Sequence, residues 1–282
     1  MSKFKTLFFV ALIAALMLTA CGGGAEEAAE AEGEEMMAVD TTVNCTDLDA
    51  GDVPDLGGEE LVFAVENAYP PFNSLDDSGE GVGWDYDIGR EICSRLNCTP
   101  VFTEAAWDGI FPAMAAGEYD VLYDGVTYTT ERDETVDYSC AYVTIGQVLL
   151  ARSDEDRFAS PDEFQADGDL VASTQITTTN EIAAHDFIGV DRTRSFEDFG
   201  LAVQAVLSGD VDAVVIDTVT AIGFMDENPG ALQIIQPNIQ SDEQLALVFS
   251  PGSDLIDPFN AALAAMADDG KLQELNDKWF NP

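Results

Sequence analysis

Positively charged side chains are scarce in this chain. Of its 282 residues, 11 are lysine or arginine and 54 are aspartate or glutamate, so the formal net charge at pH 7 is −43. A surface this acidic repels nucleic-acid phosphates, which excludes nucleic acid as a partner. Two explanations of the acidity stay open: adaptation to high salt, where screening suppresses self-repulsion, and an acidic surface without such a habitat. Because cations are so few, each arginine and lysine is a candidate for a specific role.

Groups for covalent or metal chemistry are also few. The sequence has one histidine and five cysteines, and no Ser/His/Asp order, reactive thiol or cluster of metal ligands is evident in it. An enzyme that works through a nucleophile needs an adjacent base, and no such pair stands out. These absences predict a non-enzymatic protein without a cofactor or a metal.

A long apolar segment is missing beyond the first 20 residues. Residues 7–18 are apolar, follow Lys3 and Lys5, and lead through small residues to Cys21. This pattern predicts a signal peptide over residues 1–20, because the segment is short for a membrane span. The cysteine at the cut resembles the lipobox of secreted lipoproteins, whose two acyl chains give stable anchoring. We expect an extracytoplasmic protein anchored to the cell membrane through Cys21; the alternative is an ordinary secretory signal with a chance cysteine.

Residues 21–58 lack lysine and arginine altogether. The segment continues from Cys21 as three glycines and then a repeat of alanine and glutamate. A segment of low hydrophobicity and one-signed charge buries too little surface to offset the entropy lost on ordering. We therefore expect residues 21–58 to form an acidic, disordered tether.

Four cysteines remain after Cys21, an even number that indicates disulfides in an exported protein. Cys93 lies near the end of a helical pattern and Cys98 lies just beyond it, so a turn of the chain can bring the two together. The pairing that we favour is Cys93–Cys98 with Cys45–Cys140. The other connectivities stay open.

Strand and helix patterns alternate from residue 59 to the end of the chain. Strand patterns cover residues 61–65, 99–103, 120–123, 147–151, 170–173, 193–196, 213–216 and 245–249, and helical patterns cover 85–96, 107–116, 178–186, 199–207 and 255–279. This alternation predicts an α/β fold with mainly parallel sheets. One strand out of the first set and one strand back predict two lobes joined by a two-stranded hinge. Lobe 1 would comprise residues 59–148 with 246–282, and lobe 2 residues 149–245.

Three stretches carry a family pattern in addition. They are residues 65–72 (VENAYPPF) with 83–87 (GWDYD), residues 107–139 from WDGIFPA to VDYS, and residues 209–217 (GDVDAVVID) with 278–280 (KWF). Together they resemble the amino-acid-binding class of periplasmic-type solute-binding proteins, the receptors of ABC importers. The resemblance implies a type II two-lobe fold, a small amino acid as ligand and an ABC permease as partner, and we expect a monomer. The family often has a cysteine pair at the end of its first helix, which supports Cys93–Cys98.

An amino acid needs a cation for its carboxylate, and Arg132 is the candidate. A guanidinium offers a planar fork that matches a carboxylate, which lysine does not reproduce. The resemblance implies that Thr127 and the backbone at Gly125 add donors to the same carboxylate. The alternative for Arg132 is a surface helix position paired with a neighbouring carboxylate.

Thr177 and Thr178 would contribute from the second lobe. They lie at the predicted start of a helix, where free N–H groups and the helix dipole favour an anion. The alternative is plain N-capping, which uses the same residue types. The family usually has Gly-Thr here, whereas this chain has Ile176-Thr177, so a side chain could narrow the pocket.

Asp217 follows the apolar strand pattern 213–216, at the position where the family holds the ligand's ammonium. The alternative is a capping aspartate of the next turn. Tyr69 and Trp107 match the positions where the family sandwiches the ligand's side chain, although either could belong to the core. An aromatic face also attracts a cation.

Glu66 and Asp124 flank the same cleft in the resemblance. Two carboxylates near the side-chain pocket favour a basic ligand, with polar neutral amino acids next and acidic ones last. Two other functions stay open on this scaffold. A cyclohexadienyl (prephenate or arogenate) dehydratase-like enzyme could use Glu66 or Asp124 as its general acid, and a sensory ligand-binding domain would use the same site without a transporter.

Overall fold

The computed structural model describes residues 43–280. The predicted signal peptide, the lipidation site Cys21 and residues 22–42 of the predicted tether lie outside these described residues. Within residues 43–280, no helix combines the length and the apolar character that a membrane crossing needs.

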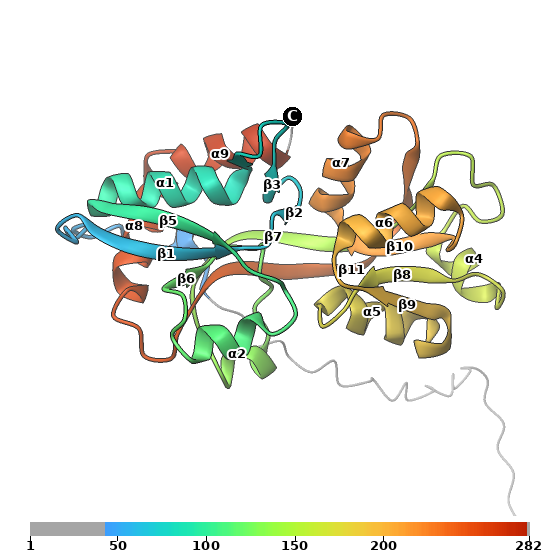
Figure 1. Ribbon diagram of the computed structural model, residues 1–282, viewed down its shortest axis with the longest axis horizontal. Helices are drawn as coiled ribbons and strands as arrows, with labels where there is room; N and C mark the ends of the chain where they lie inside the picture. Colours follow the sequence, from blue (N-terminus) through green and yellow to red (C-terminus); the bar gives the residue numbers. More distant parts are fainter. Residues whose placement is uncertain (1–42, 281–282) are drawn as a thin grey trace, which may run out of the picture. The chain divides into compact units, whose positions relative to one another are not determined.

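One eight-stranded sheet runs through the described chain in the order β5-β1-β6-β11-β7-β10-β8-β9 (Figure 1). Its strands are β1 (Glu59–Val65), β5 (Cys98–Glu104), β6 (Val121–Leu122), β7 (Asp137–Arg152), β8 (Ala172–Gln175), β9 (Thr193–Phe196), β10 (Ala213–Asp217) and β11 (Leu232–Phe249). Strands β5, β1 and β6 pair in parallel at one end, and β10, β8 and β9 pair in parallel at the other. The first set belongs to lobe 1 and the second to lobe 2.

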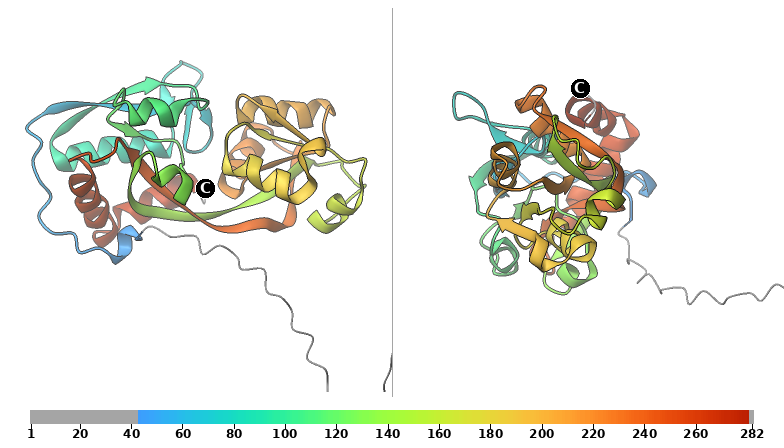
Figure 2. Two further views of the ribbon diagram at one scale, coloured as in Figure 1. Left: turned by 90° about the horizontal axis from the view of Figure 1, so that it is seen from below. Right: turned by 90° about the vertical axis from the view of Figure 1, so that its right-hand side faces the viewer.

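Strands β7 and β11 are antiparallel and connect the two lobes (Figure 2). They form the expected two-stranded hinge, but they are 16 and 18 residues long, far longer than the patterns 147–151 and 245–249. The middle of β11 is polar, and the pairing register of β11 against β7 shifts several times. The sequence of β11 therefore lacks the regular alternation of apolar and polar residues that indicates a strand. The predicted lobe boundaries fall inside these two long strands.

Helices cover both faces of the sheet. They are α1 (Trp84–Leu96), α2 (Ile110–Ala115), α3 (Thr130–Asp133), α4 (Pro161–Ala166), α5 (Thr179–Ile188), α6 (Phe199–Ser208), α7 (Thr218–Glu227), α8 (Ile256–Asp268) and α9 (Lys271–Phe280). Successive side chains of β1 point to opposite faces of the sheet. Phe63 packs with α1 and α8 on one face, and Ala64 packs with α2 on the other. In β10, Val214 packs with α6 and α7, and Val215 with α4 and α5.

Several other elements differ from the sequence patterns. The predicted helix 255–279 is two helices, α8 and α9, because the chain breaks at Asp269 and Gly270, whose φ is +82°. Helix α7 was not predicted, since it opens with Thr218-Val219-Thr220 and β-branched residues favour strands. A small separate sheet of β2 (Ala68–Tyr69), β3 (Asn73–Leu75) and β4 (Gly81–Val82) lies in lobe 1.

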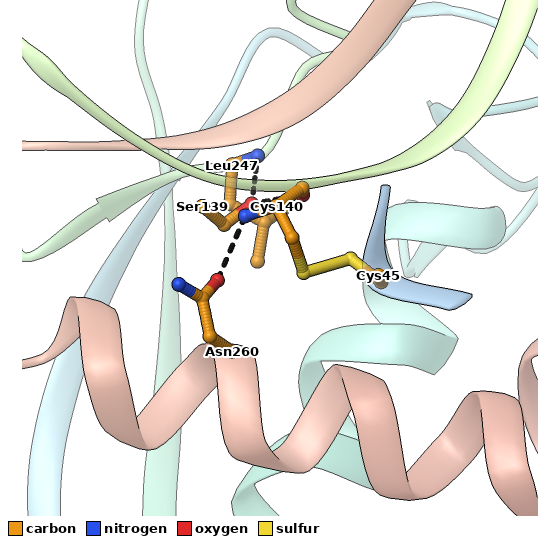
Figure 3. The surroundings of a disulfide bond; sticks show 5 residues. All are labelled: Cys45, Ser139, Cys140, Leu247 and Asn260. Atoms are coloured by element: carbon orange, nitrogen blue, oxygen red, sulfur yellow. Dashed lines mark hydrogen bonds between the residues drawn. A yellow bond between two sulfur atoms is a disulfide. The ribbon is translucent and has the colours of Figure 1, made fainter. Parts of the chain in front are cut away.

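Residues 43–58 correct the tether prediction. Cys45, in the short 3-10 helix Cys45–Asp47, is buried and forms a disulfide with Cys140 of β7. Figure 3 shows this bond beside α8, where Asn260 accepts a hydrogen bond of 2.7 Å from the Cys140 N–H. Leu48, Val53 and Leu56 pack against the lobe 1 core. The sequence predicted a tether because these apolar residues are widely spaced among acidic ones. In the structure each of them packs against the core of lobe 1.

The second disulfide joins Cys93, in the last turn of α1, to Cys98, which opens β5. Between them Asn97 has a left-handed backbone (φ +52°), which turns the chain back toward the sheet. The structure therefore contains the pairing that the sequence favoured.

Candidate functional site

A pocket lies between the two lobes, near the carboxyl ends of several parallel strands. The empty space among its side chains is about 300 Å³, including the part open to solvent, which suits a small ligand. The pocket is lined by Glu66, Tyr69, Trp107, Asp124, Gly125, Thr127, Arg132, Gln175, Thr178, Thr179, Asn180, Phe199 and Asp217.

Nine of the ten predicted ligand-binding residues line this pocket, and Thr177 is the exception. The sequence analysis missed Gln175, Thr179, Asn180 and Phe199. Gln175 ends β8, so the preference of ligands for the carboxyl ends of parallel strands could have identified it. The other three lie in the first turns of α5 and α6, which begin at the same edge of the sheet.

Arg132 lies in α3, where its backbone N–H donates to the Thr129 hydroxyl at 3.1 Å. Its guanidinium donates to the Thr127 carbonyl at 2.9 Å and lies over the rings of Trp107 and Phe111, at 5.3 and 4.6 Å from their centroids. Aromatic faces and a carbonyl hold the planar group in place without neutralising it. The side chain is thus presented to the pocket with its charge available.

No carboxylate of the described residues forms an ion pair with Arg132. The surface alternative, an ion pair with a neighbouring carboxylate such as Glu131 or Asp133, is therefore not what the structure contains. Burial lowers the pKa of Arg132, although an arginine remains charged at any physiological pH. A half-buried cation without an anion is costly, so the arrangement favours an anionic ligand group.

Asp217 ends β10 and occupies the N-cap position of α7, but its side chain makes no capping hydrogen bond. Its carboxylate instead accepts hydrogen bonds from the Tyr69 hydroxyl and, at 2.9 Å, from the Asn180 amide. Burial raises the pKa of Asp217, and the hydrogen bonds that it accepts oppose this rise. The carboxylate thus faces the pocket rather than the helix that it precedes.

Thr178 is the N-cap of α5. Its hydroxyl accepts from the Glu181 N–H at 3.1 Å and donates to the Gln175 carbonyl at 2.7 Å. The side chain therefore serves the capping role that we considered as the alternative. Neither Ile176 nor Thr177 lines the pocket, so the Ile176-Thr177 departure does not narrow it.

Thr177 has a left-handed backbone with φ +61°, a conformation that glycine adopts freely and a β-branched residue does not. Its N–H donates to the Glu181 carboxylate at 2.7 Å, and its carbonyl accepts a weak hydrogen bond of 3.5 Å from Arg132. The threonine is held in this conformation by contacts on both of its backbone groups.

Replacing Thr177 with glycine should stabilise the empty protein by about 1 kcal/mol. The left-handed conformation costs a non-glycine residue about 1–2 kcal/mol, and the greater unfolded-state entropy of glycine offsets part of the gain. Urea denaturation measures the difference. Thr179→Gly is the matched control, because Thr179 lies in a helix and should gain nothing; equal effects of the two substitutions would rule out backbone strain at Thr177.

Acidic groups gather in another part of the pocket. Glu66 accepts a hydrogen bond of 2.7 Å from Gln175 of lobe 2, and Asn73 donates to Asp124 at 2.7 Å and to Asp85 at 2.8 Å. Burial, and then the charge of Asp124, raise the pKa of Glu66 to about 9, and burial raises the pKa of Asp124 to about 7. Without a cation these carboxyl groups hold protons near neutral pH, so a cationic ligand group would be favoured there.

Aromatic side chains form the walls. Tyr69 and Trp107 are both buried, and the Tyr69 ring stacks on Phe72 and Phe199 with centroids 5.0 and 5.5 Å away. Gly125 faces this stack with φ +52°, and a Cβ atom there would lie 2.6 Å from the Tyr69 ring. Glycine is required at this position because the ring comes so close to the backbone. Within the described residues, no group of three or more metal-binding side chains is arranged to hold an ion.

Known proteins are similar to this chain in sequence and in fold. The model of the bacterial extracellular solute-binding proteins, family 3, matches residues 61–282. The L-cystine-binding protein TcyJ of Escherichia coli (strain K12) is 26% identical over 221 residues, which cover 78% of this chain and 82% of TcyJ. ABC transporter arginine-binding protein 1 of the same strain is 26% identical over 230 residues, covering 79% and 91%. A solved ancestral arginine-binding protein bound to arginine is 31% identical with a TM-score of 0.71, covering 78% and 98%.

These likenesses confirm the predicted fold, in which two lobes with mainly parallel strands are joined by a two-stranded hinge, as in type II periplasmic binding proteins. The matched family consists of solute-binding proteins, which agrees with the prediction that the chain is not an enzyme. The chain therefore belongs to the bacterial extracellular solute-binding proteins, family 3.

Proposed function

We propose that this protein is the extracytoplasmic receptor of an ABC importer and that its pocket binds one small amino acid, with a basic side chain favoured over a polar neutral one. Relatives named for arginine and cystine binding support the ligand class. Anchoring through a lipidated Cys21, a membrane permease as partner and a monomeric state belong to the same proposal. The outcome in the cell would be delivery of the captured amino acid to that permease.

The observation that carries the proposal is an unneutralised cation and a buried carboxylate in one pocket. The Arg132 fork can hold a carboxylate with two parallel hydrogen bonds. Asp217 can accept hydrogen bonds from an ammonium. The backbone end of an amino acid presents both charged groups on one carbon, so a single small ligand would satisfy both side chains.

The acidic part of the pocket supports a basic side chain. Glu66 and Asp124 are held next to each other with raised pKa values and, among the pocket-lining residues, Arg132 is the one cation. A guanidinium, ammonium or imidazolium group would supply the missing positive charge there. A ligand with an acidic side chain would bring a further carboxylate next to two carboxyl groups whose ionisation burial already disfavours.

Contacts between the lobes indicate how the receptor would close. Gln175 of lobe 2 donates to Glu66 of lobe 1, and Arg132 of lobe 1 contacts the Thr177 carbonyl of lobe 2. A ligand that touches both lobes binds the closed state better than the open one and so shifts the population toward closure. Rotation about β7 and β11 would provide the motion.

A thermal-shift screen of the purified protein in high salt tests the proposal. The panel is the twenty amino acids with ornithine and citrulline, and the largest shift is expected for arginine, lysine, histidine or ornithine. A ligand at 100 times its Kd adds about 2.7 kcal/mol to the free energy of unfolding, which raises Tm by several degrees for a protein of this size. If no amino acid in the panel raises Tm, the protein is not an amino-acid receptor. If glutamate alone raises Tm, Glu66 and Asp124 do not select a basic side chain.

One substitution can isolate the contribution of the acidic part of the pocket to ligand binding. Glu66→Gln should weaken a basic amino acid about tenfold or more, because one partner of a desolvated ion pair is lost, and should affect a neutral one less. Calorimetric Kd values provide the comparison. Glu60→Gln is the matched control, since Glu60 is an exposed carboxylate on β1, the strand that Glu66 directly follows. Equal losses for basic and neutral ligands would remove Glu66 from side-chain recognition.

A further inference from the structure

Gly223 is a buried glycine in the middle of α7, outside the set of pocket-lining residues. Glycine in a helix interior is unfavourable relative to alanine, because it loses more conformational freedom on folding. The φ of Gly223 is not positive, so the backbone itself does not require glycine at this position. The physical reason for this glycine therefore has to come from the atoms around it.

The atoms around Gly223 belong to the backbone of the other lobe. A Cβ atom on Gly223 would lie 2.7 Å from the Pro70 carbonyl oxygen, 2.8 Å from the Pro70 carbonyl carbon and 3.0 Å from the Pro71 nitrogen. Non-bonded carbon atoms prefer separations of about 3.5–4.0 Å. Pro70 and Pro71 follow β2 in lobe 1, and α7 follows β10 in lobe 2 (Figure 1). The two lobes thus meet backbone to backbone at Gly223.

Both sides of this contact are held firmly within their own lobes. In lobe 1, β2 pairs with β3, and the Pro71 carbonyl accepts a hydrogen bond of 3.0 Å from the Trp84 N–H at the start of α1. The proline rings fix φ in this segment and leave it little freedom. In lobe 2, Ala221 and Phe224 of α7 are buried in the core. A methyl group on Gly223 would therefore be accommodated by separation of the lobes, since no flexible side chain is there to move aside.

This contact lies directly beside the pocket. Tyr69, the residue before Pro70, stacks on Phe199 of α6 and donates a hydrogen bond to Asp217 of β10. These contacts join lobe 1 to lobe 2 at the pocket wall. A larger separation of the lobes at Gly223 would draw Tyr69 away from both partners, although Gly223 itself does not line the pocket.

Resting on the proposed function, we propose that Gly223 is a positioning residue for lobe closure: its missing side chain lets α7 approach Pro70 closely enough for the pocket to close, and so it sets the affinity for every ligand without contacting any. The apparent Kd of a ligand that needs the closed state is its intrinsic Kd divided by the closed fraction of the protein. A side chain on Gly223 lowers this fraction and leaves the pocket groups unchanged. The affinities for all ligands then fall by one common factor.

Gly223→Ala, with Gly223→Ser as a second small replacement, tests the inference. Calorimetry measures Kd for the best basic and the best neutral ligand of the screen, for example arginine and glutamine. Both ligands should weaken by the same factor, about tenfold or more, because overpacking against a fixed backbone is costly. Glu66→Gln provides the contrast, since it should weaken the basic ligand more than the neutral one.

Gly200→Ala is the matched control. Gly200 lies in α6 of the same lobe, and the nearest atom to a Cβ there is the Asp198 Oδ1, 3.1 Å away in the same lobe. This variant adds the same methyl group to a helix of lobe 2 without touching lobe 1. Its ligand affinities should stay within about twofold of those of the unmodified protein.

Small-angle X-ray scattering measures closure itself. Arginine at a concentration that just saturates the unmodified protein should reduce its radius of gyration, while Gly223→Ala at the same concentration should keep most of the larger radius of the open form. The Tm of empty Gly223→Ala should equal or exceed that of the unmodified protein, since alanine favours a helix more than glycine does and open lobes leave room for the methyl group.

Several results would overturn the role of Gly223 and leave amino-acid binding standing. They are unchanged affinities in Gly223→Ala, a loss confined to one of the two ligands, and a normal ligand-induced decrease in the radius of gyration. A lowered Tm of the empty variant, or failure of both variants to fold, would also overturn it, because Gly223 would then serve packing within the fold. Failure of every amino acid to bind the unmodified protein would instead overturn the proposed function on which this inference rests.

Discussion

Arg132→Ala should abolish measurable amino-acid binding while the protein stays folded. In the structure the guanidinium has no carboxylate partner among the described residues and is held by the Thr127 carbonyl and two aromatic rings. Its removal leaves the ligand's carboxylate buried without a cation, a loss of about 2–5 kcal/mol. The corresponding increase in Kd is roughly 30-fold to several thousandfold. Calorimetry with the best ligand of the screen measures it.

Two further variants make this result specific. Arg132→Lys keeps the charge and loses the planar fork, so it should recover only part of the affinity. Arg194→Ala is the matched control, because Arg194 is exposed and donates to the Asp210 carbonyl in lobe 2. The Tm of the empty Arg132→Ala protein should stay within a few degrees of the unmodified one. Unchanged ligand affinity in Arg132→Ala would remove Arg132 from the site.

Asp217→Asn should weaken amino acids about 100-fold and their deaminated analogues by less than about threefold. The asparagine keeps the size of the side chain and removes the negative charge that would face the ammonium, so the two ligand types separate the charge effect from a change of shape. The substitution also alters the hydrogen bonds with Tyr69 and Asn180. A general disturbance of the pocket would therefore weaken both ligands alike.

Competition of each ligand against a fluorescent or radiolabelled amino acid gives the two affinities. Asp210→Asn is the matched control, since Asp210 is an exposed carboxylate near the end of α6 that accepts a hydrogen bond from Ser208. Equal loss for amino acids and analogues in Asp217→Asn would mean that Asp217 does not hold the ammonium.

The two predictions concern one pair of charges that the fold brings together from far apart in the chain. Arg132 follows β6 in lobe 1, and Asp217 ends β10 in lobe 2. Asp217 is buried and Arg132 is partly buried, and neither forms an ion pair within the described residues. The pocket thus presents one positive and one negative side chain, and a zwitterion would pair with both when the lobes close around it.

The chain by itself determined the alternation of strands and helices and the positions of most pocket residues. Strand 193–196 agrees with β9 residue for residue. Asp217 stood out because it follows an apolar strand pattern at the position where the family resemblance places the ligand's ammonium. Arg132 stood out because cations are so rare in this composition. The other predicted pocket residues came from the family resemblance, which rests on motifs that a single sequence contains.

Other features were decided by the tertiary structure. Helix α7 forms from β-branched residues because packing against β10 outweighs their local preference, and the polar middle of β11 is a strand because β7 lies beside it. Residues 43–58 are fixed by Cys140 and by apolar contacts with distant parts of the chain. Glu243 gave no signal, since one carboxylate among 54 acidic residues is unremarkable. Its carboxyl group is buried and accepts a hydrogen bond from Gln147 of β7, a contact that exists only after the two strands have paired.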